Sequence, residues 1–463
     1  MQDRDMQGRD LRILVIGGGT AGWIAATHVS RHLPEATLHH VYDPRRAPIG
    51  VGEGTAPRFP MWLKATAGVE FDELRQRCQA TLKKGTEFVG WGPAGRTFLN
   101  RFQPVDYVGY HFDTADLAAV LAERVRSEIV AKRVDAVTTV HAVQGAQGPA
   151  GAEVRFEDAS VEHYDYVFDG RGFPAFEPGS PEAAGKIDLT WIPTRAALVR
   201  RTVLRDESLT TRAIARPHGW IFYIPLAEVV SFGYMHHPEC SDEAEVVADF
   251  DAFCQEQGFD EVEDRGRIRY PSFIHRTLFD GAVFRVGNAA SFIEPLEATS
   301  LGTTVRQVRE AVRLIQSPDE ERKHPSAIAV YNRKLGSFIL KNSLFIGWHY
   351  ACGSPYDTEF WRRAKERFEA ARQAVPGPMV ETFDAYAEAA RSMPGLELPL
   401  IEDAEQWRAE VFPLLTSLKP FGNFSQLNFA QIGHGLGFYE QPPSSGAAFP
   451  PSASRSSHVS AGE

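Results

Sequence analysis

The sequence predicts an α/β fold in which a three-layer module is interleaved with a β-rich block and followed by a helical carboxyl-terminal region. Three observations support this fold class. An apolar run at Leu11–Ile16 leads through a glycine-rich turn into a helical pattern at Thr20–Leu33. β-Type stretches fill most of 196–235, and from Pro325 onward the apolar residues recur mostly at helical spacing. A chain of 463 residues is long enough for roughly three domain-sized units.

The composition limits the partners of the protein. A net charge of −11 and a hydrophobic share of 43% are those of an acidic globular protein. Because nucleic-acid binding needs clustered Lys and Arg, we expect no nucleic-acid partner. No apolar run approaches membrane-spanning length and residues 1–10 are polar, so we expect no membrane partner and a cytoplasmic location. The four cysteines show no ligand spacing, which predicts neither disulfides nor a metal site.

The first turn has the spacing of a dinucleotide site. Gly17-x-Gly19-x-x-Gly22 follows the apolar run directly and opens the predicted helix with Thr20 and Ala21. The glycines permit a tight turn and close backbone approach, and the free N–H groups of the helix start favour a pyrophosphate. A second strand, Leu38–Tyr42, ends on Asp43, about 20 residues further on, where a ribose-hydroxyl acceptor is expected. Asp43 can also be read as a simple turn residue before Pro44.

Two later segments favour FAD over NAD. Residues 164–174 form a strand followed by a glycine turn, and residues 284–290 run from a strand through Gly287 and Asn288 into a helix start. Both resemble segments that wrap the extended dinucleotide in flavoprotein monooxygenases of the GR2 type, and Asn288 can bond the ribityl chain as donor or acceptor. The sequence therefore predicts a discontinuous FAD-binding module.

The remaining pattern sets the expected organisation. Helical spacing of Phe71, Leu74, Cys78 and Leu82 predicts a helix that ends at Gly85, and further helices are expected at 117–125 and 302–315. Strands are expected at 134–143, 152–156, 164–168 and 283–286. The expected domains are a flexible 1–10, the FAD-binding module at 11–195 and 265–325, a β-rich substrate block at 196–264, a helical region at 326–440 and a disordered tail at 441–463.

Four ordered segments carry a closer resemblance. Residues 49–57 read Ile-Gly-Val-Gly-Glu-Gly-Thr-Ala-Pro, and Lys83 lies eight residues before Trp91. Residues 109–113 read Gly-Tyr-His-Phe-Asp, and residues 291–302 read Ser-Phe-Ile-Glu-Pro-Leu-Glu-Ala-Thr-Ser-Leu-Gly. Together these segments resemble the flavin-dependent tryptophan halogenase family, in the same order from about Leu11 to Trp361.

The resemblance implies a two-component enzyme with two sites. Reduced FAD, delivered by a separate flavin reductase, reacts with O2 to give a hydroperoxide that oxidises chloride or bromide. The hypohalous acid then travels through a tunnel to an electron-rich aromatic substrate. The family's catalytic lysine maps onto Lys83, which would hold or be halogenated by the hypohalous acid. Its glutamate maps onto Glu297, which would orient the acid or take the ring proton.

Each of these two residues has another reading. Lys83 and Lys84 also suit the last turn of a helix that ends at Gly85, where cations are favoured by the helix dipole. Glu294 lies three residues before Glu297 and on a similar face if the segment is helical. Only the family pattern selects Lys83 and Glu297.

The family pattern also assigns cofactor and halide contacts. Gly52, Glu53 and Leu296 are expected beside the FAD, and Thr299 and Ser300 match the residues whose backbone amides bind halide. The family more often has glycine in place of Ser300, and glycine adopts a positive φ more readily than serine.

The strand Trp220-Ile221-Phe222-Tyr223-Ile224-Pro225 matches the family's Trp-x-Trp-x-Ile-Pro signature, with Phe222 in place of the second tryptophan. In the family this strand lies near the flavin and separates it from the substrate. The other reading is a buried strand with aromatic packing.

The substrate is less clearly indicated. Free tryptophan, another indole, a pyrrole, a phenol or a peptide-borne tryptophan all fit an electron-rich ring. An FAD-dependent aromatic monooxygenase and a non-catalytic flavin-binding partner are alternative functions. The aromatic candidates for substrate recognition are Trp348, His349, Tyr350, Phe360, Trp361 and the segment 421–438.

Overall fold

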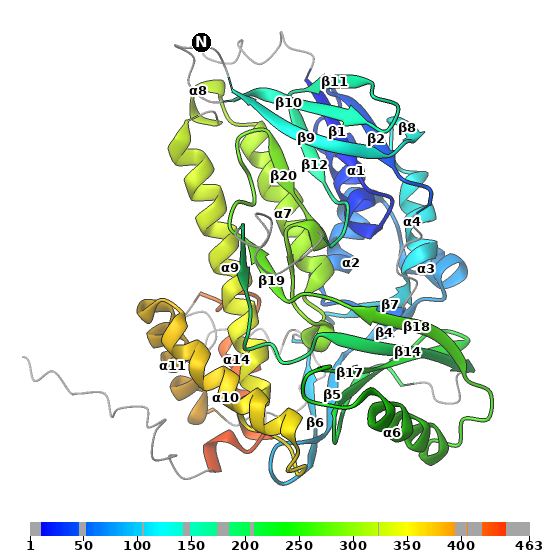
Figure 1. The fold of residues 1–463 in the computed structure, drawn as a ribbon, viewed down its shortest axis with the longest axis vertical. Helices are drawn as coiled ribbons and strands as arrows, with labels where there is room; N and C mark the ends of the chain where they lie inside the picture. Colours follow the sequence, from blue (N-terminus) through cyan, green and yellow to red (C-terminus); the bar gives the residue numbers. More distant parts are fainter. Residues whose placement is uncertain are drawn as a thin grey trace, which may run out of the picture.

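The computed structural model describes residues 11–45, 52–103, 106–141, 149–173, 185–203, 208–322, 324–393, 405 and 419–440 (Figure 1). The sequence predictions for 1–10 and 441–463, and part of the family-like segment at 49–57, lie outside these residues. Within the described part of the chain, no helix is both long and apolar enough to cross a bilayer.

The first layer of the FAD-binding module is a parallel sheet of five strands in the order β20-β12-β1-β2-β8. Its strands are β1 Arg12–Ile16, β2 Thr37–Tyr42, β8 Glu128–Ala131, β12 Tyr166–Asp169 and β20 Val283–Arg285. Ile13 and Val15 point into the main core, whereas Leu14 and Ile16 point into a second cluster. Because both faces of β1 are buried, the sheet must be covered on both sides.

Helices cover one face of this sheet and a second sheet covers the other. α1 Thr20–His32 packs against α7 Ser300–Ile315 and α4 Thr114–Ala122. The opposite cluster joins Leu14 and Ile16 to Val154 and Phe156 of the antiparallel sheet β11-β10-β9. Its strands are β9 Val134–His141, β10 Pro149–Phe156 and β11 Val161–Tyr164. The predicted three-layer α/β module is confirmed.

The β-rich block is a seven-stranded sheet in the order β18-β14-β17-β16-β15-β5-β6. Its strands are β5 Gly85–Trp91, β6 Arg96–Arg101, β14 Ala196–Val203, β15 Thr211–Arg216, β16 Gly219–Pro225, β17 Val229–His236 and β18 Glu263–Arg269. One face is covered by α6 Glu243–Glu256. The sheet reaches beyond the predicted 196–264 because β5 pairs in parallel with β15, a contact between segments far apart in the chain.

Short elements connect the module to this sheet. Two three-stranded sheets have the orders β3-β7-β4 and β13-β19-β21. These elements are β3 Gly52–Gly54, β4 Thr81–Lys83, β7 Gly109–Asp113, β13 Lys186–Asp188, β19 Phe273–His275 and β21 Ser291–Phe292, with the helices α2 Arg58–Trp62, η1 Leu63–Ala67, α3 Phe71–Cys78, η2 Gly287–Ala289 and η3 Pro295–Glu297.

The predicted helix through Leu82 is wrong at its carboxyl end. α3 stops at Cys78, and Gln79 has a left-handed backbone with φ 52°. Leu82 and Lys83 belong to β4 and pair with Tyr110 and Gly109 of β7. The apolar spacing from Cys78 to Leu82 matched a helix, but pairing with a strand distant in sequence overrides such a local pattern.

The carboxyl-terminal region is helical, as predicted. It comprises α8 Asp319–Arg322, α9 Pro325–Ala351, α10 Glu359–Ala374, α11 Gly377–Arg391, α14 Gln426–Gly435 and η4 Phe438–Glu440. In Figure 1, α9 runs from beside β20 down to α10 and α14. Its aromatic residues pack inward, with Phe345 stacked on Phe424 at 3.8 Å between ring centroids.

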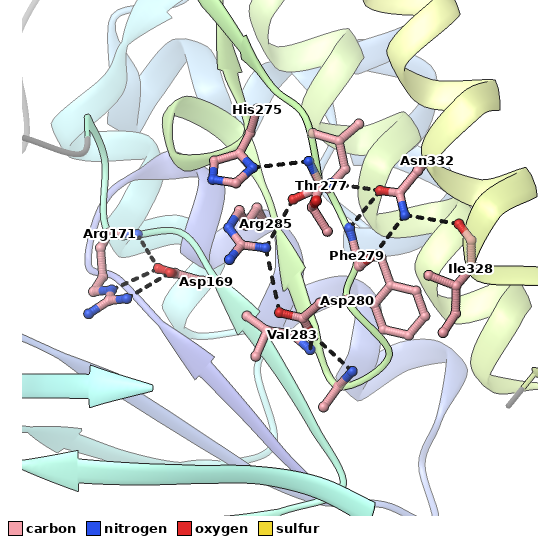
Figure 2. A network of polar contacts seen from close by, with 12 residues as sticks. Asp169, Arg171, His275, Thr277, Phe279, Asp280, Val283, Arg285, Ile328 and Asn332 are labelled. Carbon is pink, nitrogen blue, oxygen red and sulfur yellow. Dashed lines mark hydrogen bonds and ion pairs between the residues drawn. The ribbon is translucent and has the colours of Figure 1, made fainter. Parts of the chain in front are cut away.

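Hydrogen bonds of Asn332 hold α9 against the FAD-binding module (Figure 2). Its Oδ1 accepts hydrogen bonds from the N–H groups of Leu278 at 2.6 Å and Phe279 at 2.9 Å, while Nδ2 donates to the carbonyl of Phe279. Asp280 caps the same loop by accepting from the N–H of Val283 at 2.9 Å. These contacts hold α9 against the edge strand β20, and so set the position of the residues further along the helix.

Candidate functional site

The glycine turn after β1 has the geometry of a pyrophosphate cradle. Gly17 has φ +125°, and a Cβ on it would lie 2.5 Å from the carbonyl oxygen of Gly170. A Cβ on Gly22 would overlap the carbonyl oxygen of Gly17, whereas the space around Gly19 is open to 4 Å. Gly19 is the N-cap of α1 and no side chain caps the helix, so its first N–H groups are available to an anion.

A second turn, from the far end of the module, meets this cradle. Gly287 has φ +56°, and a Cβ there would collide with the Cβ of Ala21. The N–H of Gly287 donates to Oε1 of Gln307 at 2.9 Å, which holds the turn against α7. Gly17 thus adjoins Gly170, and Gly287 adjoins Ala21 of the first turn. Such an extended cradle fits FAD.

Asp43 follows β2 at the same edge. Its Oδ1 accepts hydrogen bonds from the N–H of Arg45 at 3.0 Å and from Nε of Arg45 at 2.9 Å. These hydrogen bonds lower the pKa of Asp43. The local turn expected as the alternative reading of Asp43 is thus present.

Lys83 closes β4 with its side chain in the interior. The residue is 1% exposed, and burial lowers the pKa of its ammonium to about 8, with Glu297 acting in the opposite direction. The Nζ atom lies 5.7 Å from the ring centroid of Phe102. Gly54 lies beside it, because a Cβ there would be 3.2 Å from Nζ. Lys83 is therefore not a solvent-facing cation at a helix end.

Glu297 closes η3 and faces two other elements. Asn100 of β6 donates from Nδ2 to both carboxylate oxygens at 3.1 Å. His349 of α9 places Nε2 at 2.8 Å from Oε1. The side chains of His349 and Glu297 are 0% and 3% exposed. The fold thus brings Lys83 and Glu297 into one buried region, where the carboxylate acts electrostatically on the ammonium.

Glu294, the alternative acid, belongs to a separate network. It is 0% exposed and accepts hydrogen bonds from the hydroxyls of Thr194 and Tyr350. The hydroxyl of Tyr270 donates in turn to Thr194 at 2.9 Å. Burial raises the pKa of Glu294 to about 7. Its hydrogen bonds hold Tyr350 of α9 against the segment before α7, so the role of Glu294 is structural.

The segment after Glu297 shapes a small pocket. Ala298 adopts a left-handed backbone with φ 51°, and Thr299 is the N-cap of α7, of which Ser300 is the first residue. The pocket is lined by Gly287, Ser291, Phe292, Ile293, Thr299, Ser300, Thr303, Thr304, Gln307 and Ile339. The positive φ thus falls on Ala298 and not on Ser300, so a serine fits this position without strain. Leu296, just before, is 2% exposed.

The strand β3 connects this region to the seven-stranded sheet. The N–H of Gly52 donates to Oγ of Ser231 at 3.2 Å, and a Cβ on Gly52 would lie 3.5 Å from Cγ2 of Ile224. Burial raises the pKa of Glu53 to about 7. Its Oε2 atom is buried and has no hydrogen-bond partner within the described ranges. An adjacent ligand with a donor would satisfy this oxygen.

All residues of β16 are buried, but they divide between two faces. Trp220, Phe222 and Ile224 lie in the main core, whereas Ile221 and Tyr223 pack toward α6. The carbonyl of Pro225 accepts a hydrogen bond from Thr81 of β4 at 2.7 Å. The carboxyl end of this strand therefore contacts β4, and Trp220 on its core face lies 6.4 Å from Trp91 of β5 between ring centroids.

The aromatic residues predicted for substrate recognition are mostly core residues. Trp348, Tyr350, Phe360 and Trp361 are between 0% and 3% exposed. His349 differs from these four residues because its ring makes a polar contact with Glu297. Asn100 lies in the strand Arg-Thr-Phe-Leu-Asn-Arg, whose mixed polar pattern gave no signal for a place beside Glu297. His111 was likewise given no role, and its ring is hydrogen-bonded to Thr81 and Thr211 near Lys83.

The glycine turn after β1, the second glycine turn and the adjoining pocket define an α/β protein of the dinucleotide-binding class. More specifically, the chain belongs to the tryptophan halogenase family, whose model matches residues 12–108 and 103–394. Tryptophan 7-halogenase RebH of Lentzea aerocolonigenes is 24% identical, with 97% of this chain and 94% of the relative covered. Tryptophan 7-halogenase KtzQ of Kutzneria sp. (strain 744) is 25% identical, with 93% and 90% covered.

Solved structures share the fold. Xcc4156, a flavin-dependent halogenase from Xanthomonas campestris, superposes with a TM-score of 0.74 at 20% identity, covering 93% of this chain and 89% of that chain. MibH, a lathipeptide tryptophan 5-halogenase, gives a TM-score of 0.72 at 20% identity, with 93% and 86% covered. The resemblance inferred from the four ordered segments is confirmed.

Proposed function

We propose that the protein is a two-component flavin-dependent halogenase that transfers chlorine or bromine to an electron-rich aromatic ring, with tryptophan or another indole as the substrate class. The observation that carries the proposal is the convergence of Lys83 and Glu297 in one buried region. They come from a β-strand of the small central sheet and from the turn before α7. This arrangement places a hydrogen-bond donor and a carboxylate away from water, where each acts most strongly.

The cofactor in this proposal is FAD, supplied in its reduced form by a separate flavin reductase. Gly17, Gly19, Gly22, Thr20 and Ala21 would hold the pyrophosphate, Asp43 the ribose, and Gly287 with Asn288 the ribityl chain. Gly52, Glu53 and Leu296 would contact the flavin, and the orphaned Oε2 of Glu53 supports a ligand donor at that point. When bound and reduced, FAD supplies the reaction with O2 that oxidises halide to hypohalous acid.

The halide in this proposal lies at the start of α7. The first N–H groups of a helix favour an anion, and Thr299 and Ser300 line the pocket that Gly287 also borders. The left-handed turn at Ala298 directs the chain so that Glu297 faces Asn100 and His349 while Thr299 faces this pocket. Halide and carboxylate are thereby kept on different sides of the same short turn.

The chain's own residues act on the oxidised halogen. The Lys83 ammonium would donate a hydrogen bond to the oxygen of hypohalous acid and make its halogen more electrophilic. Glu297 would accept the proton that the ring carbon loses when it is halogenated. We assign the separation of substrate from flavin to the bulky strand of Trp220, Phe222, Ile224 and Pro225, whose end contacts Thr81 of β4.

The test is a reconstitution. The protein is incubated with FAD, a flavin reductase, NADH, O2, bromide or chloride, and a panel of indoles, pyrroles, phenols and tryptophan-containing peptides, with mass spectrometry as the readout. A halogenated product that disappears in Lys83→Ala, while FAD binding is retained, supports the proposal. Full halogenation by Lys83→Ala would overturn it. An oxygenated product formed without halide would instead show an aromatic monooxygenase, which the family comparison does not favour.

A further inference from the structure

The ring of His349 makes two hydrogen-bond contacts, one through each nitrogen. Nδ1 lies 2.9 Å from the carbonyl oxygen of Phe345, one turn earlier in α9. Nε2 lies 2.8 Å from Oε1 of Glu297. Both partners are oxygens that ordinarily accept hydrogen bonds, which makes the number of protons on the ring decisive.

A proton count limits the states of this pair. A backbone carbonyl can only accept, so Nδ1 of His349 carries a hydrogen. A neutral imidazole with its hydrogen on Nδ1 leaves Nε2 as an acceptor, which would face the acceptor Oε1 of an ionised Glu297 at 2.8 Å. Two facing acceptors repel each other. One further proton must therefore lie between Nε2 and Oε1.

The orientations of the neighbouring groups support this count. A flipped His349 ring would turn carbon atoms toward both oxygens and lose both hydrogen bonds. The amide of Asn100 is oriented by Asn428, whose Nδ2 donates to Oδ1 of Asn100 at 3.2 Å. Nδ2 of Asn100 is thereby turned toward Glu297, where it donates to both oxygens.

The surroundings of the pair are dry and aromatic. The ring of His349 lies 5.2 Å from the ring centroids of both Phe88 and Phe345. With 0% and 3% of the two side chains exposed, an isolated carboxylate here would bear a large desolvation penalty. A shared proton makes the pair neutral as a whole and removes much of that penalty.

We propose that His349 is a positioning residue that shares one proton with Oε1 of Glu297, and that Oε2 of Glu297 is the oxygen that receives the proton from the substrate ring. This inference deepens the proposed function and rests on it for the role of Oε2. In the reaction, the ring carbon bonds to the halogen of hypohalous acid as the halogen–oxygen bond breaks, and the oxygen leaves as hydroxide. The carbon–hydrogen bond then breaks, its electron pair restores the aromatic ring, and the proton bonds to Oε2.

The consequence is a division of labour between the two carboxylate oxygens. Oε1 is engaged by His349 and cannot rotate toward the substrate without losing that bond. Oε2 contacts only Asn100 among the hydrogen-bond partners in the described ranges, so it remains able to accept a proton. His349 thus presents one defined oxygen of Glu297 for the reaction.

The first experiment detects the shared proton in the full-length protein without using its activity. Proteins with 15N-labelled histidine are compared by NMR as wild type, Glu297→Gln and His349→Gln. We expect a low-field proton coupled to Nε2 of His349 in the wild type and its loss in both variants. His28 is an internal control, because its Nδ1 accepts a hydrogen bond from Trp62 at 3.0 Å and burial lowers the pKa of its ring to about 3. A wild-type His349 without that low-field proton would overturn the proposal.

The second experiment measures turnover with the ring-deuterated substrate. Glutamine at position 349 can still donate to Oε1 but has no proton to share, so we expect kcat to fall by about 100-fold with KM unchanged. A primary deuterium isotope effect should also appear, because ring deprotonation becomes slow. His28→Gln, a buried histidine outside this region, should turn over like the wild type. Wild-type kcat in His349→Gln would contradict the assignment.

The two experiments separate this inference from the proposed function. If the wild type forms no halogenated product on any substrate, the proposed function fails, while the NMR comparison still decides whether the proton is shared. If the wild type halogenates and the low-field proton is absent, only the inference about His349 fails.

Discussion

Gly54 and Lys83 are so close that a methyl group on the glycine would lie 3.2 Å from the ammonium nitrogen. The same methyl would lie 2.9 Å from Oγ1 of Thr211. Gly54 and Lys83 are on β3 and β4, the two outer strands that pair with β7. Because Gly54 has no side chain, the ammonium of Lys83 can lie beside it. The position of the ammonium therefore depends on a glycine at residue 54.

Gly54→Ala should displace the Lys83 ammonium and lower kcat by on the order of 100-fold, because small misplacements of a reacting group are costly. FAD binding should be retained, since the cradle is formed by other segments. Gly336→Ala on α9 is the matched control, because no heavy atom lies within 4 Å of its added methyl. Steady-state kinetics and an FAD titration of both variants check this expectation. Equal turnover in the two variants would disprove it.

Halogenation should decline as the pH rises through about 8, because burial lowers the pKa of Lys83 to about 8 and the neutral amine is a poorer donor. A pH profile of kcat, measured with FAD and halide at saturation, tests this. FAD binding over the same range is the control. A flat profile up to pH 10 would show that the ammonium is not required.

The lowered pKa of Lys83 makes stability rise with pH, whereas it makes activity fall. The folded pKa of Lys83 lies below its ordinary 10.5, so the unfolded chain binds more protons between about 8 and 10.5. The contribution of Lys83 to the free energy of unfolding therefore rises with pH across that window. Lys83→Met should lack this rise. Urea unfolding of both proteins at pH 7.5 and 10 provides the comparison, and parallel changes in the two would refute the assignment.

Glu294 and Glu297 should differ in their effect on activity. Glu297→Gln removes the proton acceptor and should lower kcat by about 100-fold or more. Glu294→Gln should lower kcat only a few-fold. The Glu294 carboxyl accepts hydrogen bonds from Thr194 and Tyr350, so its replacement would affect the reaction only through the packing of α9. Halogenation rates and thermal unfolding of the two variants decide this. A larger loss of kcat in Glu294→Gln than in Glu297→Gln would assign the role of proton acceptor to Glu294.

Gly19→Val should separate FAD binding from folding. The backbone of Gly19 has φ −82°, which valine adopts, and no atom lies within 4 Å of its added Cβ. We expect a change of about 0.5 kcal/mol or less in the free energy of unfolding, as at other uncrowded surface sites. The side chain would fill the space proposed for the pyrophosphate, and FAD affinity should fall by more than tenfold. Gly22→Ala, which overlaps Gly17, should lose both stability and FAD binding.

Local features of this fold could be predicted from the sequence. The glycine turn, the strand before it and the helix after it are specified by residues within one short stretch. Gly22 is required by its contact with Gly17 in the same turn, and Gly17 by a positive φ that glycine adopts readily. The discontinuous FAD-binding module was expected for a related reason, since each strand–turn segment carries its own glycine signal. The meeting of Gly287 with Ala21 agrees with that expectation.

Contacts between segments distant in the chain could not be predicted from the sequence. Lys83 was open to a reading at a helix end, because the spacing of Cys78 and Leu82 is helical and strand pairing leaves no local trace. β5 was assigned to the FAD-binding module, although it completes the seven-stranded sheet by pairing with β15. His349 was grouped with aromatic residues for the substrate, and its contact with Glu297 depends on how α9 crosses the molecule.

The sequence by itself determined the glycine turn between β1 and α1, because such a turn depends on contiguous residues, and its resemblance to a family selected the two residues proposed for chemistry. Only the tertiary structure decided that Lys83 is buried on a strand, that Glu294 is occupied by Thr194 and Tyr350, and that Asn100 and His349 engage Glu297. The physical reason is that burial and hydrogen-bond partners arise from packing between elements distant in sequence. Those contacts set the protonation and direction of a side chain, which its residue type leaves open.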